Sequence, residues 1–118
     1  MSVRNQPQVY IKTYQLLKEL HEVVRNMPKH YKYTLGESSL ELAWRCLDLI
    51  VEANFYYNTR IKRDRITELS LTFDKLKLRL RMLNELKLIN LKKYRYLQFN
   101  YVNSIGEMIG GWKKWVNS

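Results

Sequence analysis

The stretch of residues 63–88, RDRITELSLTFDKLKLRLRMLNELKL, restricts the fold of this chain more than any other part of the sequence. As a helix it carries apolar residues at alternating steps of three and four, which form one continuous stripe for packing against a core. A second and narrower apolar line falls roughly opposite, at about 100° per residue. A helix in an isolated bundle needs one apolar face, so the second line predicts a contact with another subunit or protein. The stripe is Ile66, Leu69, Phe73, Leu76, Leu80 and Leu83, and the second line is Leu71, Leu78 and Met82.

Basic side chains run between these two apolar lines. Lys77 and Arg81 are four residues apart and therefore point the same way, a spacing that suits two nearby phosphates. The alternative is that both are solvated flank residues that pair weakly with Asp74 and Glu85. The residues that we predict to contact nucleic acid are Lys77, Arg81, Lys75, Arg79 and Arg63.

The charge of the chain favours a polyanionic partner. There are 21 Lys and Arg residues against 11 Asp and Glu, a formal charge of +10, which favours nucleic acid and, second, an anionic membrane surface. The balance is +2 for residues 1–28, −1 for 29–58, +5 for 59–88 and +4 for 89–118. Because the last two segments carry nearly all of the excess, we expect a basic face made by the third and fourth helices.

Turn-forming residues are rare, since two prolines and four glycines interrupt the 118 residues, which favours few and long helices. Pro28 ends the first helix, and Thr34 with Glu37 matches a capping box that begins the second, with the linker KHYKYT before it. We predict one all-α domain, 1–118, folded as an antiparallel four-helix bundle. The helices are expected at about 8–27, 35–58, 61–88 and 91–116.

Two of these helices have further features. In the second, we expect Trp44 on the buried face and Leu49 on the far side. In the fourth, Gly106 and Gly110 share one face, which lets another backbone approach closely and makes them candidates for a subunit interface. The alternative is that Gly110 and Gly111 stop this helix early.

Aromatic residues among basic ones form another candidate in the fourth helix. Tyr96 and Phe99 lie off its core face, close in sequence to Lys92, Lys93 and Arg95. Aromatic side chains in such a setting can stack on unpaired bases, but they also suit a buried subunit contact, which we favour here.

The sequence offers no catalytic or metal-binding constellation. His21 and His30 lack metal-ligand spacing, and no phosphate-binding glycine loop or catalytic triad pattern is present, so we expect no enzyme, metal or cofactor. The single cysteine, Cys46, excludes an internal disulfide and fits a reducing compartment. The N-terminal residues show no signal-peptide pattern, and no run reaches the roughly 20 apolar residues of a membrane span, so we expect a cytoplasmic protein without a membrane partner.

Three stretches carry a resemblance to a known family: MPKHYKYTLGESSLELAWRCLDLIVEAN, KLKLRLRMLNELKLI and YVNSIGEMIGGWKKW. They are similar to the accessory variability determinant (Avd) proteins of diversity-generating retroelements, over residues 8–116. The resemblance implies a four-helix bundle that forms a barrel-like homopentamer with a positively charged surface. It also implies a non-enzymatic partner of a reverse transcriptase, which binds template RNA and cDNA and enables mutagenic reverse transcription. Two basic residues on the third helix contribute to the family's surface, and Lys77 and Arg81 take their places here, with Lys at the first where the family has Arg.

We therefore predict a homo-oligomeric accessory factor that holds nucleic acid through phosphate contacts, without reading bases, and presents it to the transcriptase. One alternative is a freestanding RNA-binding four-helix bundle of the ribosomal RNA intervening-sequence type, which has no transcriptase partner. A second is a bundle enzyme with a buried cofactor, which the lack of ionisable clusters at core positions disfavours.

Overall fold

The apolar stripe of residues 63–88 forms the buried face of the central element of the fold. In the computed structural model, which describes residues 7–118, this element is helix α4 (Thr59–Glu85). Each of the six stripe residues is at most 2% exposed. Fully burying such a side chain contributes about 1.5–3 kcal/mol, so the stripe orients α4 firmly against the rest of the chain.

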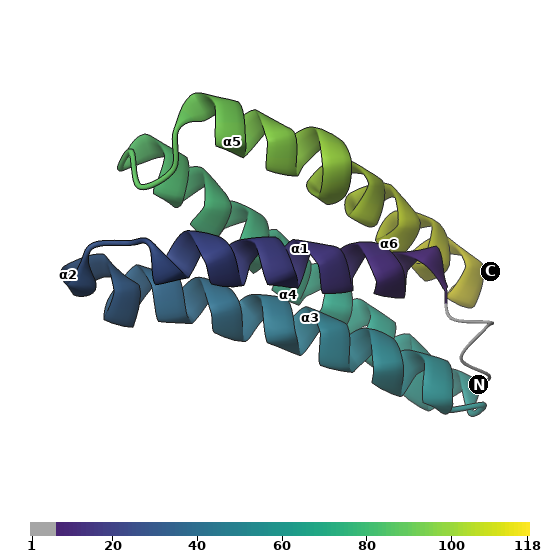
Figure 1. The fold of residues 1–118 in the computed structure, drawn as a ribbon. Helices are drawn as coiled ribbons and strands as arrows, with labels where there is room; N and C mark the ends of the chain where they lie inside the picture. Colours follow the sequence, from purple (N-terminus) through teal and green to yellow (C-terminus); the bar gives the residue numbers. More distant parts are fainter. Residues whose placement is uncertain (1–6) are drawn as a thin grey trace.

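Four helical rods pack side by side, each antiparallel to the one before it (Figure 1). The first rod is α1 (Gln8–Arg25). The second runs without interruption through α2 (Lys29–Tyr31), a π-helical turn η2 (Lys32–Gly36) and α3 (Glu37–Phe55), and α4 is the third. The fourth is α5 (Leu91–Leu97), a second π-helical turn η3 (Gln98–Val102) and α6 (Asn103–Val116). This arrangement confirms the predicted all-α four-helix bundle.

The second rod begins earlier than the capping-box pattern predicted. The segment expected to be a linker before residue 35 is helical from Lys29 onward. The carbonyl of Pro28 accepts hydrogen bonds from the backbone N–H groups of Tyr31 and Lys32, and a proline at a helix start is favourable because its missing N–H needs no partner there. The predicted capping box is wrong, because the Thr34 hydroxyl donates instead to the His30 carbonyl, one turn back, at 2.9 Å.

The buried face of α3 also differs from the expected one. Leu49, expected on the far side, is completely buried, whereas Trp44, expected in the core, is 46% exposed. The reason is that α3 packs against both α1 and α4, so its buried arc is rotated and wider than one stripe. Trp44 lies at the edge of that arc, where its indole N–H donates to His21 Nε2 of α1 at 3.1 Å.

Three helices end earlier than predicted, and α3 ends at Phe55 rather than residue 58. The first ends at Arg25 rather than residue 27, and α4 ends at Glu85 rather than residue 88. Lys87 has a φ of 60°, the left-handed conformation that terminates helices, and the Leu88 N–H then bonds to the Leu83 carbonyl at 2.9 Å. At its start, α4 takes in Thr59 and Arg60, because the Asn58 side chain caps it by accepting from the Ile61 N–H at 3.1 Å.

The glycines of the fourth rod do not end it. Helix α6 continues through Gly110 and Gly111 to Val116, so the alternative of an early stop is wrong. Among the described residues, a Cβ atom added at Gly110 or Gly111 would meet no atom within 4 Å, and one at Gly106 would make an ordinary 3.6 Å contact with Phe73. Packing within the chain therefore does not explain these glycines.

Gly36 is different, because α1 crosses close to it. A Cβ atom there would lie 2.9 Å from Val24 Cγ1 and 3.2 Å from Met27 Sδ. We expect Gly36→Ala to lower the free energy of unfolding by about 1 kcal/mol, since overpacking typically outweighs the gain in helix propensity. The measurement is urea denaturation followed by circular dichroism.

The matched control is Gly111→Ala, which meets open space. This substitution should raise the free energy of unfolding by about 1 kcal/mol, because alanine is the better helix former. Two shifts of the same sign would contradict the close approach of α1 to Gly36.

Candidate nucleic-acid interface

Helix α4 holds the five predicted basic residues, but it points them in three directions. Arg63 lies on the side that faces α6, where its Nη2 donates to the Val116 carbonyl at 3.4 Å. Lys77 and Arg81 follow on the same side by helical spacing, and we call these three residues the α6-side flank. Arg79 lies on the α3 side, and Lys75 lies between the two flanks on the outward surface.

Within the α6-side flank, Lys77 and Arg81 form ion pairs only with residues of α4 itself. Lys77 Nζ is 3.2 Å from Asp74 Oδ1, and Arg81 Nε is 3.1 Å from Glu85 Oε2. Asp74 and Glu85 are the two carboxylates that were predicted to pair weakly with Lys77 and Arg81. The Lys77 and Arg81 side chains are 47% and 68% exposed, and exposed pairs of this kind contribute about 1 kcal/mol or less. A phosphate could therefore compete for both cations.

Arg79 and Lys75 have different surroundings. Arg79 is half-buried against α3, where its Nε donates to the Ser38 hydroxyl at 3.0 Å. Lys75 is exposed and forms no hydrogen bond or ion pair with another residue in the described range 7–118. It sits within the second apolar line, between Leu71 and Leu78. The five predicted residues thus do not form one continuous patch on a single chain.

The second apolar line is on the outward surface of α4. Leu71, Leu78 and Met82 are 56%, 54% and 42% exposed in the single chain. The two interface glycines lie on another helix: Gly106 faces Phe73 of α4, and Gly110 follows it one turn along α6 in open space. The predicted interface residues therefore make up two separate surfaces of the chain.

A network of ion pairs crosses the seam between α3 and α4, and sequence reasoning missed it. Arg45 Nη2 is 2.8 Å from Glu68 Oε2, and Arg45 Nη1 is 3.2 Å from Glu52 Oε2. The other oxygen of Glu52 accepts from Arg65 Nε at 2.8 Å. Hydrogen bonding to Glu68 raises the pKa of the Arg45 guanidinium above its ordinary value. Arg45 and Glu52 are both on α3, but their partners Glu68 and Arg65 are on α4, so spacing along one helix gives no signal for the contacts that cross the seam.

Tyr96, one of the two aromatic candidates of the fourth rod, is held within the chain. The Glu19 carboxylate of α1 accepts from Lys93 Nζ at 2.6 Å, from the Tyr96 hydroxyl at 3.2 Å and from the Tyr101 hydroxyl at 3.4 Å. The hydrogen bond from Lys93 is the largest cause of the lowered pKa of Glu19. Phe99 is 75% exposed and stays a candidate for an external contact.

Across the described residues, no group of three or more His, Cys, Asp or Glu side chains could hold a metal ion. Cys46 is buried, and burial raises the pKa of its thiol to about 12, so it is a packed side chain and a poor nucleophile. Over the same residues, none of the helices combines the length and apolar character needed to cross a membrane.

Comparison with known proteins identifies the family. No match was found among curated proteins or among solved structures. Residues 9–116 match the family model described as bAvd-like, which covers all four rods of the bundle. The proteins of this family are generally non-catalytic, and membership implies an accessory role in a diversity-generating retroelement. This chain therefore belongs to the bAvd-like family of retroelement accessory proteins.

Proposed function

We propose that this chain is a non-enzymatic, homo-oligomeric factor that binds template RNA and its cDNA together with a reverse transcriptase, and so enables mutagenic reverse transcription. Family membership supports the accessory role. The observation that carries the nucleic-acid part is the exposure of Lys77 and Arg81, one turn apart, with only weak carboxylate partners. Lys77 and Arg81 lie about 6 Å apart along the helix axis.

The chemistry of these side chains suits phosphates rather than bases. An arginine fork can bind a phosphate through two hydrogen bonds, and a lysine ammonium acts as a compact point charge. Neither needs a particular base, so binding through the α6-side flank would fix the position of the strand without selecting its sequence. Such a factor would hold RNA or cDNA of any sequence near the transcriptase.

Assembly would strengthen this binding. The outward surface of α4 is apolar at Leu71, Leu78 and Met82, and a neighbouring copy of the chain can cover it. The open backbone at Gly110 allows a second neighbouring copy to approach closely. The family resemblance implies a pentamer, for which five charges of +10 give a formal +50. Binding should weaken steeply with salt, because each phosphate contact releases condensed counterions.

The alternative is a freestanding RNA-binding bundle that has no transcriptase partner. The two differ in what co-purifies with the chain from its native host. We expect a reverse transcriptase, encoded next to this gene, to be retained together with RNA. Recovery of RNA alone, with no transcriptase gene nearby, would favour the freestanding bundle.

A prediction for RNA binding concerns the charge of the α6-side flank. Changing Lys77 and Arg81 together to Glu should abolish RNA retention at physiological salt, because two attractive contacts become repulsive. Fluorescence anisotropy with labelled RNA measures the affinity, while circular dichroism and light scattering should show unchanged helix content and mass.

A matched control makes the same charge change elsewhere. Lys29 and Lys32 are exposed or half-exposed on a different helical rod, near the start of the second rod, and changing both to Glu alters the net charge equally. If this pair lowers RNA affinity as much as the Lys77 and Arg81 pair, only total charge matters and the flank is not a binding site.

A separate prediction concerns assembly. Leu78→Lys or Met82→Lys should reduce the assembled protein to a smaller species, because an ammonium group would be buried in an apolar contact. Light scattering reads the mass, and Tyr33→Lys, at an exposed ring on η2, serves as the control. An unchanged mass in both α4 variants would exclude the second apolar line as the interface.

A further inference from the structure

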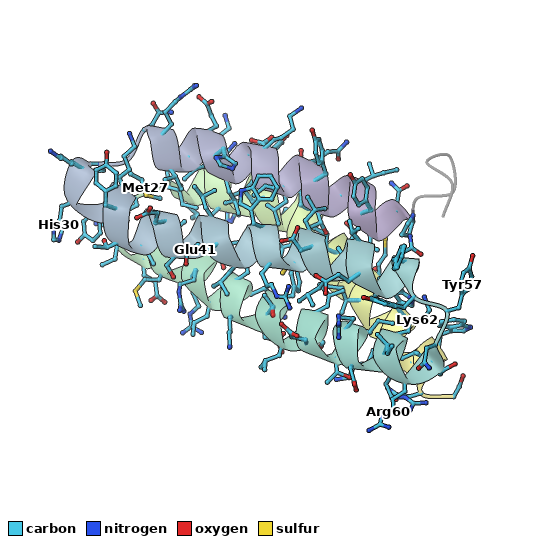
Figure 2. The ribbon with its side chains drawn as sticks, turned by 90° about the horizontal axis from the view of Figure 1, so that it is seen from below. Met27, His30, Glu41, Tyr57, Arg60 and Lys62 are labelled. Atoms are coloured by element: carbon cyan, nitrogen blue, oxygen red, sulfur yellow. The ribbon has the colours of Figure 1, made fainter. Side chains whose placement is uncertain are left out.

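The end of the bundle where α3 leads into α4 carries exposed aromatic rings that the core does not use. Phe55, the last residue of α3, is 68% exposed, and Tyr57 in the turn is 95% exposed. Figure 2 shows Tyr57 and Arg60 projecting from this end, with Met27 and His30 at the opposite one. Large aromatic rings with this much solvent exposure indicate a surface that binds a partner.

The Phe55 ring is supported by contacts with neighbouring side chains. Tyr56 packs edge-to-face against Phe55, with ring centroids 5.1 Å apart and planes at 87°. The Arg65 guanidinium lies 5.6 Å from the Tyr56 ring centroid and is itself held by Glu52 at 2.8 Å. Phe55 is therefore fixed from one side and open on the other, while Tyr57 makes no hydrogen bond or ring contact with any described residue.

The same end is strongly basic. Residues 52–66 and 112–118 contain six Lys and Arg and two acidic residues, Glu52 and Asp64. Two of the six are occupied within the chain: Arg65 by Glu52, and Lys62 by the Ala53 carbonyl at 2.5 Å, with a pKa lowered by burial.

The other cations are accessible. The side chains of Arg60, Lys113 and Lys114 are exposed and pair with no residue in the described part of the chain. Arg63 has only a long 3.4 Å bond to the Val116 carbonyl. Lys113 lies two turns after Gly106 on the side of α6 that faces α4, which places it near the start of α4 with Arg63. We call Phe55, Tyr57, Arg60, Arg63 and Lys113 the aromatic–basic end.

Charge and ring exposure together point to one class of occupant. A second copy meeting this end through the same surface would bring two sets of uncompensated cations together. Unpaired nucleic acid offers what the surface lacks: phosphates for the cations and open base faces for the rings. A duplex is a poorer fit, because its bases are already stacked and only its phosphates are available.

We propose that the aromatic–basic end binds an unpaired segment of RNA or cDNA, with bases stacked on Tyr57 and Phe55 and phosphates held by Arg60, Arg63 and Lys113. This inference rests on the proposed nucleic-acid binding and adds to it a second contact that selects single strands over duplexes. The α6-side flank binds the phosphates of both single-stranded and duplex nucleic acid, and the aromatic rings supply the preference for single strands.

The experiment compares Tyr57→Ala and Phe55→Ala with Tyr33→Ala, whose ring is 61% exposed on η2 at the opposite end. Fluorescence anisotropy measures binding to a labelled single-stranded oligouridylate and to an RNA duplex of equal length, at several salt concentrations. Each substitution at the aromatic–basic end should weaken single-strand binding about tenfold and leave duplex binding and the salt dependence unchanged. Tyr33→Ala should change neither affinity.

An abasic oligonucleotide isolates the stacking contact. It has the same phosphates but no base faces, so Tyr57→Ala should not weaken its binding. By contrast, Arg60→Gln combined with Arg63→Gln should weaken binding to every ligand and reduce the salt dependence by one to two phosphate contacts. An equal loss on the abasic strand, or no loss on oligouridylate, would overturn the inference.

Two further outcomes separate this inference from the proposed function. If wild-type protein binds RNA through Lys77 and Arg81 while Tyr57→Ala binds oligouridylate normally, only the aromatic–basic end is refuted. If wild-type protein binds no RNA, both proposals fail. Loss of transcriptase capture, or of binding to anionic lipid vesicles, with unchanged RNA affinity would assign the rings to that partner and overturn the inference.

Discussion

Burial of the apolar stripe of α4 is the interaction on which the rest of the structure depends. Turning α4 by half a turn would expose six buried side chains, each contributing about 1.5–3 kcal/mol, and would bury three in exchange. The helix therefore has one acceptable rotation. Once that rotation is set, the directions of all other residues on α4 follow, and Leu71, Leu78 and Met82 must point outward.

The same rotation sorts the charges of α4 into two groups. On the α3 side, Arg65 and Glu68 meet Glu52 and Arg45, so their charges are largely compensated between helices. On the α6 side, the fourth rod supplies few acidic residues, and Lys77 and Arg81 have ion-pair partners only on their own helix. Lys77 and Arg81 are consequently compensated only by exposed carboxylates of α4 itself.

Sequence reasoning succeeded where a pattern lies within one helix. The period of the apolar residues in 63–88 identified both the buried stripe and the exposed line, because a helix of this length repeats its period several times. It failed where a local pattern has two physical outcomes. The hydroxyl of Thr34 can cap a helix start or bond to the carbonyl one turn back, and the second outcome occurs because the helix already begins after Pro28.

The sequence by itself determined that α4 has two apolar sides and that Lys77 and Arg81 lie together, since both depend only on helical geometry. Only the tertiary structure decided which cations stay available. Arg79 is held by Ser38 of α3, whereas Lys77 pairs only with a residue one turn away. The physical reason is that partners within a helix follow from spacing, but partners across a seam follow from how two helices are rotated and aligned against each other.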